Sequence, residues 1–369
     1  MNPRFHQENL PVALGCLLAA LPITAAPAET AAPPTRRTPH LSPDYTSLVL
    51  PPNIAPMNFI IEEDGTRFRT RLSGPAGSPI VVSGRSPQVA IPMKPWNALL
   101  RANVGSHIRI DIAVLSREGQ WRELQPVTNH VAPDELDGYL VYRRLLPLYN
   151  IYRTMGIYQR DLESFQETPV LDNARFGRGC LNCHTFLQHN PDRMALHIRS
   201  QDSGNPMLLT ASNQVATVAK TSGYMSWHPS GRLIAASANK LSLFFHTKGE
   251  TRDVFDADSD LGIYRLDSNT VVSPPPIARP DRLETWPCWA PDGQSLYFSS
   301  APKLGNMDRR RFRQIRYDLL RITYDIDHDR WGEPETIVSA EATGRSAVQP
   351  RISPDGRFLV YGLCAYGHF

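Results

Sequence analysis

One run of residues has types and spacing that suggest a specific chemistry. Cys180-Leu181-Asn182-Cys183-His184 has the pattern C-x-x-C-H, at which c-type haem is attached to proteins. Two thiols about one helical turn apart can form thioethers with the two vinyl groups of haem, and the adjacent histidine can ligate the iron. We therefore expect one covalently bound haem c, held by Cys180 and Cys183, with His184 as the proximal iron ligand.

Chance and the competing uses of paired cysteines explain this run poorly. The Cys and His frequencies of the chain give on the order of 0.002 matches over its length. A zinc site would need two more ligands, and Cys288 and Cys364 lie more than 100 residues downstream without a second C-x-x-C. A thioredoxin-like redox pair would sit in a βαβ pattern, which the surrounding sequence lacks.

The candidates for the sixth iron ligand all lie downstream of the motif: His189, Met194 and His197. If 194–199 is a strand, Met194 and His197 point to opposite faces, so at most one of them can face the iron. We favour His197 over Met194 as the distal ligand by a small margin; the alternative is that His189 is a surface histidine and His197 a packed one. Methionine would raise the reduction potential relative to a second histidine, and an open site would permit small-molecule chemistry.

Four arginines flank the motif and are candidate partners for the haem propionates, although a solvated loop could carry the same residues: Arg175, Arg178, Arg193 and Arg199.

The stretch before the motif has a helical pattern. Tyr139, Tyr142, Arg143, Leu145 and Leu146 recur at intervals of three and four residues. Pro147 should end this helix, and a second helical pattern follows over 148–165. The tyrosines of this stretch either pack on a sheet or form an aromatic wall for a flat cofactor. We expect 133–200 to be a helical haem-c segment.

The last third of the chain contains a repeat. The copies at 226–235, 288–297 and 351–360 each consist of a short strand, a Pro-Ser-Gly or Pro-Asp-Gly turn and an apolar strand. Proline presets the backbone of such a turn, and glycine accepts the positive φ. Outer strands are expected at 261–267 and 319–326, so the pattern predicts β-propeller blades over 201–369.

The spacing and number of the copies predict an incomplete propeller. They lie 62 and 63 residues apart, against about 40 to 45 for a plain four-stranded blade, which indicates inserted loops. Residues 194–222 could add a partial blade, whereas a ring closes with about four to eight blades. We therefore expect either a truncated sequence or a ring completed by another chain.

The first residues resemble a targeting segment. Arg4 gives a basic start, an apolar run extends over 10–28, and 26–28 reads Ala-Pro-Ala, as at a signal peptidase site. We expect a signal peptide over 1–28, export to the periplasm and no membrane span after cleavage. Cys16 lies at the front of the apolar run, where a lipoprotein site would be misplaced. Residues 29–44 are rich in Ala, Pro and Thr, and are expected to form a disordered linker.

Residues 45–132 are expected to form a β-sandwich-like domain. The clearest strand is 107–115, in which apolar and polar residues alternate, and a polar turn at 117–120 leads into a second strand at 121–124. Shorter strands are expected at 58–62, 79–83 and 88–91. Trp96 and Trp121 are interpreted as packing residues rather than ligand platforms.

The composition agrees with a mainly β protein and excludes some partners. The 369 residues include 33 prolines, which favour turns and edge strands over helices. The net charge is only +3, which offers no basic field for nucleic acid. Five cysteines are too few for a disulfide scaffold.

The order of these elements resembles a bacterial family of exported haem-c proteins with TolB-type, WD40-like β-propeller repeats. The likeness covers most of 43–369 and rests on 43–56, on 180–199 and on the turns, of which Trp289-Ala290-Pro291-Asp292-Gly293 nearly repeats the W-S-P-D-G signature. This resemblance implies an architecture more than a reaction.

Two classes of function follow from these features. In the first, which we favour, the chain is a periplasmic mono-haem electron carrier whose blades dock a redox or envelope protein. In the second, it is an envelope binding scaffold in which the haem is structural or sensory. A haem enzyme such as a peroxidase is less favoured because no distal acid–base pair stands out. The hydrolase motifs G-x-S-x-G and H-E-x-x-H do not occur.

Overall fold

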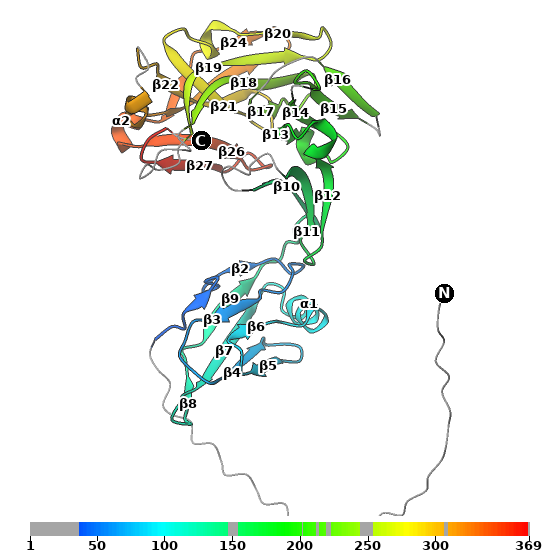
Figure 1. Ribbon diagram of the computed structural model, residues 1–369, viewed down its shortest axis with the longest axis vertical. Helices are drawn as coiled ribbons and strands as arrows, with labels where there is room; N and C mark the ends of the chain where they lie inside the picture. Colours follow the sequence, from blue (N-terminus) through cyan, green and yellow to red (C-terminus); the bar gives the residue numbers. More distant parts are fainter. Residues whose placement is uncertain are drawn as a thin grey trace, which may run out of the picture. The chain divides into compact units, whose positions relative to one another are not determined.

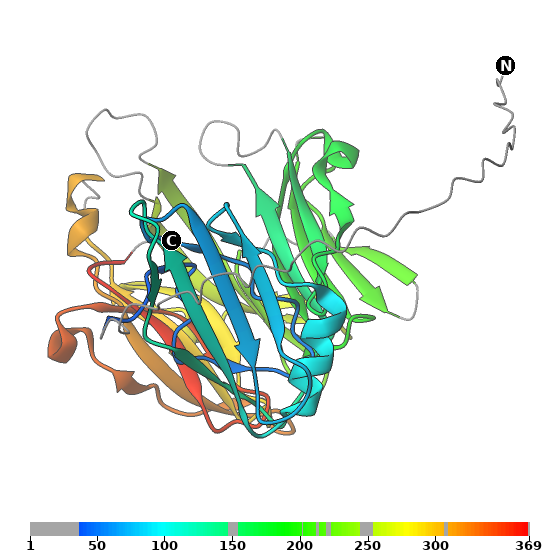
Figure 2. The ribbon, with the colours of Figure 1, turned by 90° about the horizontal axis from the view of Figure 1, so that it is seen from below.

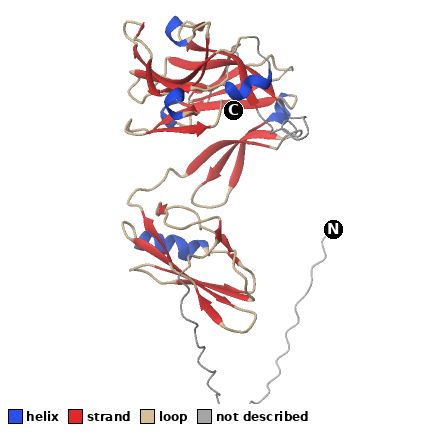
Figure 3. Ribbon diagram, turned by 90° about the vertical axis from the view of Figure 1, so that its left-hand side faces the viewer, coloured by secondary structure: helices blue, strands red, loops and turns tan. Residues whose placement is uncertain are grey.

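The computed structural model shows a mainly β protein, as predicted, and strands dominate Figure 3. Two α-helices occur in the part of the chain that the model describes, α1 (Met93–Ala102) and α2 (Ala340–Thr343), and no described helix is long and apolar enough to cross a membrane. The chain forms two compact units, unit 1 (Met1–Asp137 with Leu162–Ser164) and unit 2 (Gly138–Asp161 with Phe165–Phe369). The described residues are 37–146, 154–200, 202–211, 214–218, 223–243, 254–305 and 309–367. The expected signal peptide at 1–28 lies outside them.

Unit 1 contains two sheets and helix α1 around one core (Figure 1). The larger sheet has the order β2 (Val49–Leu50), β9 (Val127–Val131), β7 (His107–Leu115), β4 (Arg67–Ser73), β5 (Ile80–Gly84), with β8 (Trp121–Glu123) also paired to β7. The smaller sheet has the order β1 (Leu41–Ser42), β3 (Phe59–Ile61), β6 (Gln88–Val89). The strands expected at 58–62, 79–83, 88–91 and 107–115 and the hairpin to 121–124 are confirmed.

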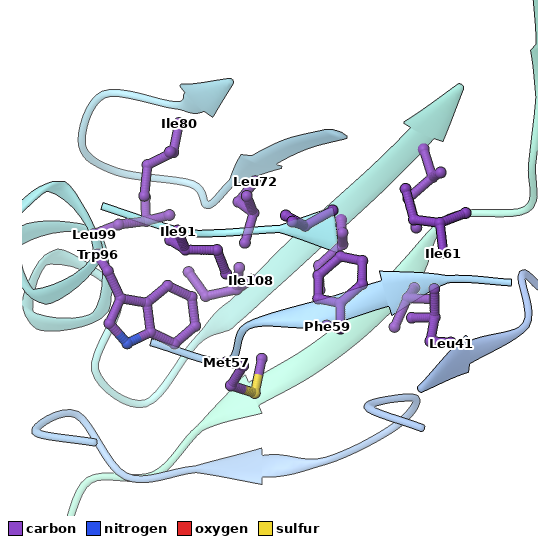
Figure 4. Packing of buried hydrophobic residues seen from close by; sticks show 14 of the residues in the cluster. Leu41, Met57, Phe59, Ile61, Leu72, Ile80, Ile91, Trp96, Leu99 and Ile108 are labelled. Atoms are coloured by element: carbon purple, nitrogen blue, oxygen red, sulfur yellow. The ribbon is translucent and has the colours of Figure 1, made fainter. Parts of the chain in front are cut away.

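Helix α1 was not predicted, because prolines at 92 and 95 make its first turn look like a loop. Its apolar side carries Trp96, Leu99 and Leu100, which are fully buried in the core shown in Figure 4. Figure 2 shows this helix, in cyan, beside the strands of unit 1. The indole Nε1 of Trp96 donates to the Ile54 carbonyl at 2.9 Å, so this residue is a packing residue, as predicted.

The end of the stretch expected to be a disordered linker is ordered. Residues 1–36 lie outside the described part, but Leu41 is buried in the core and β1 pairs with β3. Arg37 forms an ion pair with Glu63 at 2.5 Å, and its carbonyl accepts from the amide of Gln125. The apolar Leu41 and these polar contacts attach 37–44 to unit 1, although its composition suggested a linker.

The prediction of a helical segment at 133–200 is wrong. Its described residues contain five strands and two short 3₁₀ turns, η2 (Asn173–Phe176) and η3 (Leu187–His189). Strands β10 (Tyr139–Leu145), β11 (Met155–Asp161) and β12 (Glu167–Asp172) form an antiparallel sheet, followed by β13 (Cys180–Phe186) and β14 (Met194–Arg199). The last of these confirms the strand predicted at 194–199.

Cross-strand pairing explains why the helical spacing misled. Tyr142 pairs directly with Tyr158, their rings stack at 6.5 Å, and the Arg144 guanidinium lies 3.8 Å from the Tyr158 ring centre. Aromatic residues gain from such pairs on a pleated sheet. Spacings of three and four residues therefore occur here by coincidence. The expected aromatic wall also included Tyr149 and Tyr152, which lie outside the described residues.

The rest of unit 2 consists of antiparallel sheets that follow one another along the chain (Figure 1). Sheet I has the order β13, β14, β15 (Met207–Ala211), β16 (Gln214–Val218). Sheet II has the order β17 (Met225–Trp227), β18 (Leu233–Leu243), β19 (Val254–Arg265), β20 (Thr270–Val272). Sheet III has the order β21 (Arg282–Trp289), β22 (Ser295–Pro302), β23 (Asp318–Asp325), β24 (Arg330–Trp331), with β25 (Glu335–Val338) on β23, and sheet IV pairs β26 (Ser346–Ile352) with β27 (Leu359–Cys364). Four-stranded sheets connected in sequence order are the arrangement of propeller blades.

The predicted repeat is confirmed at the level of the turns. Gly231, Gly293 and Gly356 have φ of 70°, 73° and 72°, and each amide donates to the carbonyl three residues before it, at 2.9, 2.9 and 2.8 Å. The turn at Gly293 also contacts the neighbouring sheet. A Cβ built there would lie 2.7 Å from Nε2 of His228, whereas a Cβ at Gly356 meets nothing within 4 Å.

These two glycines give a matched prediction. Gly356→Ala should lower the free energy of unfolding by about 1 kcal/mol, because alanine resists positive φ. Gly293→Ala should lower it by about 1 to 3 kcal/mol more, because it also displaces His228. Urea unfolding of both variants measures the difference, and equal losses would show that sheets II and III do not pack through this turn.

Two carboxyl groups are buried between sheets II and III. Asp256 on β19 and Glu284 on β21 have exposed fractions of 0% and 1%. Asp256 accepts a hydrogen bond from Asn239 at 2.8 Å, and Asn239, Ser259 and the Asp258 backbone oppose the rise in its pKa, whereas the Oε2 atom of Glu284 has no partner. Burial raises the pKa of each group to about 7. Both acids therefore bind a proton more tightly in the folded than in the unfolded chain.

This difference predicts how stability depends on pH. Between about pH 4 and pH 7 the folded state holds protons that the unfolded state has released, so the free energy of unfolding should fall as the pH rises through this range and level off above it. Asp256→Asn should flatten this slope, whereas Asp327→Asn, an exposed control, should leave it unchanged. Thermal unfolding at a series of pH values checks the prediction, and an unchanged slope in Asp256→Asn would contradict it.

Candidate functional site

The C-x-x-C-H motif lies at the start of sheet I, on a strand rather than on a helical turn. Strand β13 pairs with β14 through Asn182 opposite His197 and Thr185 opposite Ala195. Between these two pairs β13 advances by three residues and β14 by two, so β13 has one extra residue. This is a β-bulge, and it contains Cys183 and His184. Cys183 has a φ of 55°, in the left-handed region. The expectation of a helical turn is therefore wrong, and the bulge is what sets the directions of these two side chains.

Asn173 positions the chain at the entry to this strand. It is 3% exposed, its Nδ2 donates to the Gly179 carbonyl at 3.1 Å, and its Oδ1 accepts from the Met155 amide at 3.2 Å. Asn173 thus ties β11 to the residue that precedes Cys180. No sequence pattern indicated this role.

The two thiols are half-buried and are not joined in a disulfide. Burial raises the pKa of Cys183 to about 12 and also raises that of Cys180, while Arg199 and Arg143 oppose both shifts. Cys180 adds to the rise at Cys183, so the two groups interact. Both thiols are therefore neutral at physiological pH.

His184 supplies a neutral imidazole. Burial lowers its pKa, the Val141 backbone raises it through a hydrogen bond, and Arg143 lowers it further. A backbone bond that favours the protonated ring is one in which the ring N–H donates to the carbonyl. The same bond orients metal-ligating histidines and leaves the other ring nitrogen available.

A cavity of about 490 Å³ adjoins His184. The first strand of each of the four sheets contributes to its wall, through His184 from β13, Trp227 from β17, Trp289 from β21 and Ile352 from β26. The wall also contains Phe186, Cys288, several prolines and one charged side chain, Arg351. In a propeller the first strands line the central channel, and a volume of this size suits a small molecule or cofactor.

The sulfur-bearing residues of the motif do not belong to this wall. Cys180 packs against the apolar cluster that contains Met155 and Leu196, and Cys183 against the cluster that contains Met207 and Trp227. His184 therefore faces the cavity, whereas the two cysteines lie among apolar side chains beside it.

The two candidate distal ligands lie on opposite faces of β14, as the strand pattern predicted. Met194 is half-buried and packs against the cluster around Leu196. His197 is 0% exposed, and neither of its ring nitrogens has a hydrogen-bond partner. Burial, followed by Arg199, lowers the pKa of His197 to about 4, although the nearby Asn205 backbone favours its proton. His189 is exposed and lies in the cavity wall.

The arginines near the thiols are only partly those considered from the sequence. Arg175, Arg178 and Arg193 are exposed, whereas Arg199 acts on both thiols and on His197. Arg143, which acts on both thiols and on His184, was placed in an expected helix instead.

Tyr224 was also not anticipated. Its pKa is raised to about 12, by burial first and then by Cys183, and its ring lies 5.8 Å from that of Trp286. In contrast, the repeat could have indicated Trp227 and Trp289, because they occupy equivalent positions on the first strands of sheets II and III. The described residues contain no group of three or more His, Cys, Asp or Glu side chains that could hold a metal ion.

Comparisons with known proteins give distant structural similarity alone. No protein-family model and no curated protein sequence matches the chain. Its structure is distantly similar to those of β-propeller proteins. Kuenenia stuttgartiensis hydrazine synthase aligns with a TM-score of 0.35 and 11% identity over 70% of this chain and 71% of that one. An oligogalacturonate lyase from Vibrio parahaemolyticus aligns with a TM-score of 0.30 and 8% identity over 53% of this chain and 52% of that one. An oligogalacturonate lyase in complex with manganese aligns with a TM-score of 0.33 and 10% identity over 70% of this chain and 82% of that one.

The thiol environment makes a direct prediction. In the haem-free protein, alkylation of Cys183 by iodoacetamide at pH 8 should be about 1,000-fold slower than that of an ordinary thiol, because a pKa near 12 leaves little thiolate. Peptide mass spectrometry over time measures the rate, with Cys364 in β27 as the internal reference. Equal rates at Cys183 and Cys364 would contradict the raised pKa of Cys183.

Proposed function

We propose that the protein is a mono-haem c-type cytochrome that transfers electrons in the periplasm. In this proposal Cys180 and Cys183 hold the haem as thioethers, and His184 is the proximal ligand. When bound, the haem supplies a one-electron couple between Fe(II) and Fe(III). The sheets of unit 2 would then dock a redox or envelope protein.

The observation that carries this proposal is the setting of His184. Burial lowers the pKa of its imidazole, and the ring lies in the wall of an aromatic cavity. A ligating histidine needs a free nitrogen lone pair, and a neutral imidazole supplies one. Aromatic residues such as Trp227 and Trp289 suit the faces of a macrocycle. Arg351, in the wall, and Arg143, near the thiols, suit its anionic propionates.

The two free thiols suit thioether formation with haem, but β13 must rearrange locally before they can reach it. Thioether formation adds an S–H group across each vinyl double bond, so two free cysteines are needed, and Cys180 and Cys183 are free. Neither belongs to the cavity wall, so attachment requires the bulge at Cys183 and His184 to open. A bulge lacks part of the ladder hydrogen bonding, which makes it the point of β13 that changes at least cost.

Of the two distal candidates, we favour His197. Buried polar atoms nearly always have partners, yet both nitrogens of His197 lack one. A bond to iron would satisfy one of them. Met194 packs in an apolar cluster, where its thioether needs no partner.

One observation also favours the second candidate function, an envelope binding scaffold with a structural haem. The cavity wall is built from the first strands of all four sheets. A group bound there would contact each sheet and stabilise their packing whether or not it exchanges electrons.

Absorption spectra and voltammetry of the protein matured with haem test the proposal. We expect a six-coordinate low-spin spectrum, a reversible one-electron wave and no binding of carbon monoxide. His197→Ala should open the sixth position to carbon monoxide, whereas Met194→Ala should not. A haem that dithionite does not reduce would favour the scaffold. Carbon monoxide binding by Met194→Ala but not by His197→Ala would mean that Met194, and not His197, is the distal ligand.

A further inference from the structure

Two histidines of unit 1, outside the site described above, lie directly opposite each other. His107 begins β7 and pairs with His130 of β9 in antiparallel register. At the neighbouring position, the Val131 amide donates to the Ser106 carbonyl, whereas the His130 amide donates to Leu48 instead. His107 and His130 therefore form a non-hydrogen-bonded pair, the type in which side chains are closest, with Cβ atoms about 4.5 to 5.5 Å apart.

Both side chains are exposed on the outer face of the sheet. They alternate with the buried Ile108, Asn129 and Val131, whose side chains point to the other face. Together with Val49 and Thr128 they line an open groove of about 480 Å³. Arg109, the one permanent cation in this groove, has its Nε 2.8 Å from Oδ1 of Asp111, so its charge is partly balanced.

We propose that His107 and His130 chelate one divalent transition-metal ion. Two imidazoles this close on one face can both direct a ring nitrogen to a single ion at about 2.0 to 2.1 Å. Imidazole suits Zn²⁺, Ni²⁺ and Cu²⁺ and not the oxygen-preferring Mg²⁺ or Ca²⁺. The groove leaves room for water at the remaining positions, so the ion is exchangeable.

Titration of the full-length chain, expressed with haem maturation so that Cys180 and Cys183 do not compete for the metal, with NiCl₂ and separately with ZnCl₂ tests the proposal by calorimetry. We expect one ion per chain, and an affinity that falls about 10-fold or more in His107→Ala and equally in His130→Ala, because each substitution removes the chelate. His328→Ala is the matched control, since His328 is an exposed histidine of unit 2, and it should leave the affinity unchanged. MgCl₂ should give no binding at this site.

Each other outcome overturns the proposal. No Ni²⁺ or Zn²⁺ binding by the wild-type chain means that the pair is an ordinary solvated surface. A loss in only one of the two variants means that the histidines do not act together, and an equal loss in His328→Ala means that the binding is nonspecific. Both substitutions are at exposed positions of a sheet. Thermal unfolding curves that match the wild type will show that a variant with lower affinity is still folded.

Discussion

The pairing of β13 with β14 is the interaction on which the candidate site depends. Side chains alternate between the two faces along a regular strand, and Cys180 and Cys183 pack in two different apolar clusters. The extra residue between Asn182 and Thr185 interrupts the alternation and places His184 beside the cavity. Asn173 and the Val141 backbone then fix the strand and the imidazole from outside sheet I.

Sheets I to IV of unit 2 supply the surroundings that the motif alone lacks. Each sheet brings its first strand to the cavity, and the turns at Gly231 and Gly293 pack against neighbouring parts of the unit. Burial in this setting keeps the thiols protonated and His184 neutral. It leaves both nitrogens of His197 without partners, an unfavourable arrangement that a bound metal would relieve.

Local signals in the sequence predicted part of this structure. Alternation along 107–115 and the Pro-x-Gly turns depend on nearby residues alone, and both are confirmed. The helix expected over 139–146 failed because Tyr142 gains more from its partner Tyr158, a long-range pairing that spacing does not reveal. The same limit applies to the site. The motif could be recognised, but the cavity wall joins segments up to about 210 residues apart, from Val141 to Pro354, and the roles of Arg143 and Asn173 arise only from tertiary contacts.

Peptide mass spectrometry of the protein matured with haem is the decisive measurement of whether Cys180 and Cys183 carry the proposed haem. We expect a single haem on the chain, located on the proteolytic fragment that contains both cysteines, and no haem in a variant with Cys180→Ala and Cys183→Ala. An unmodified fragment from cells that mature other c-type cytochromes normally would contradict it.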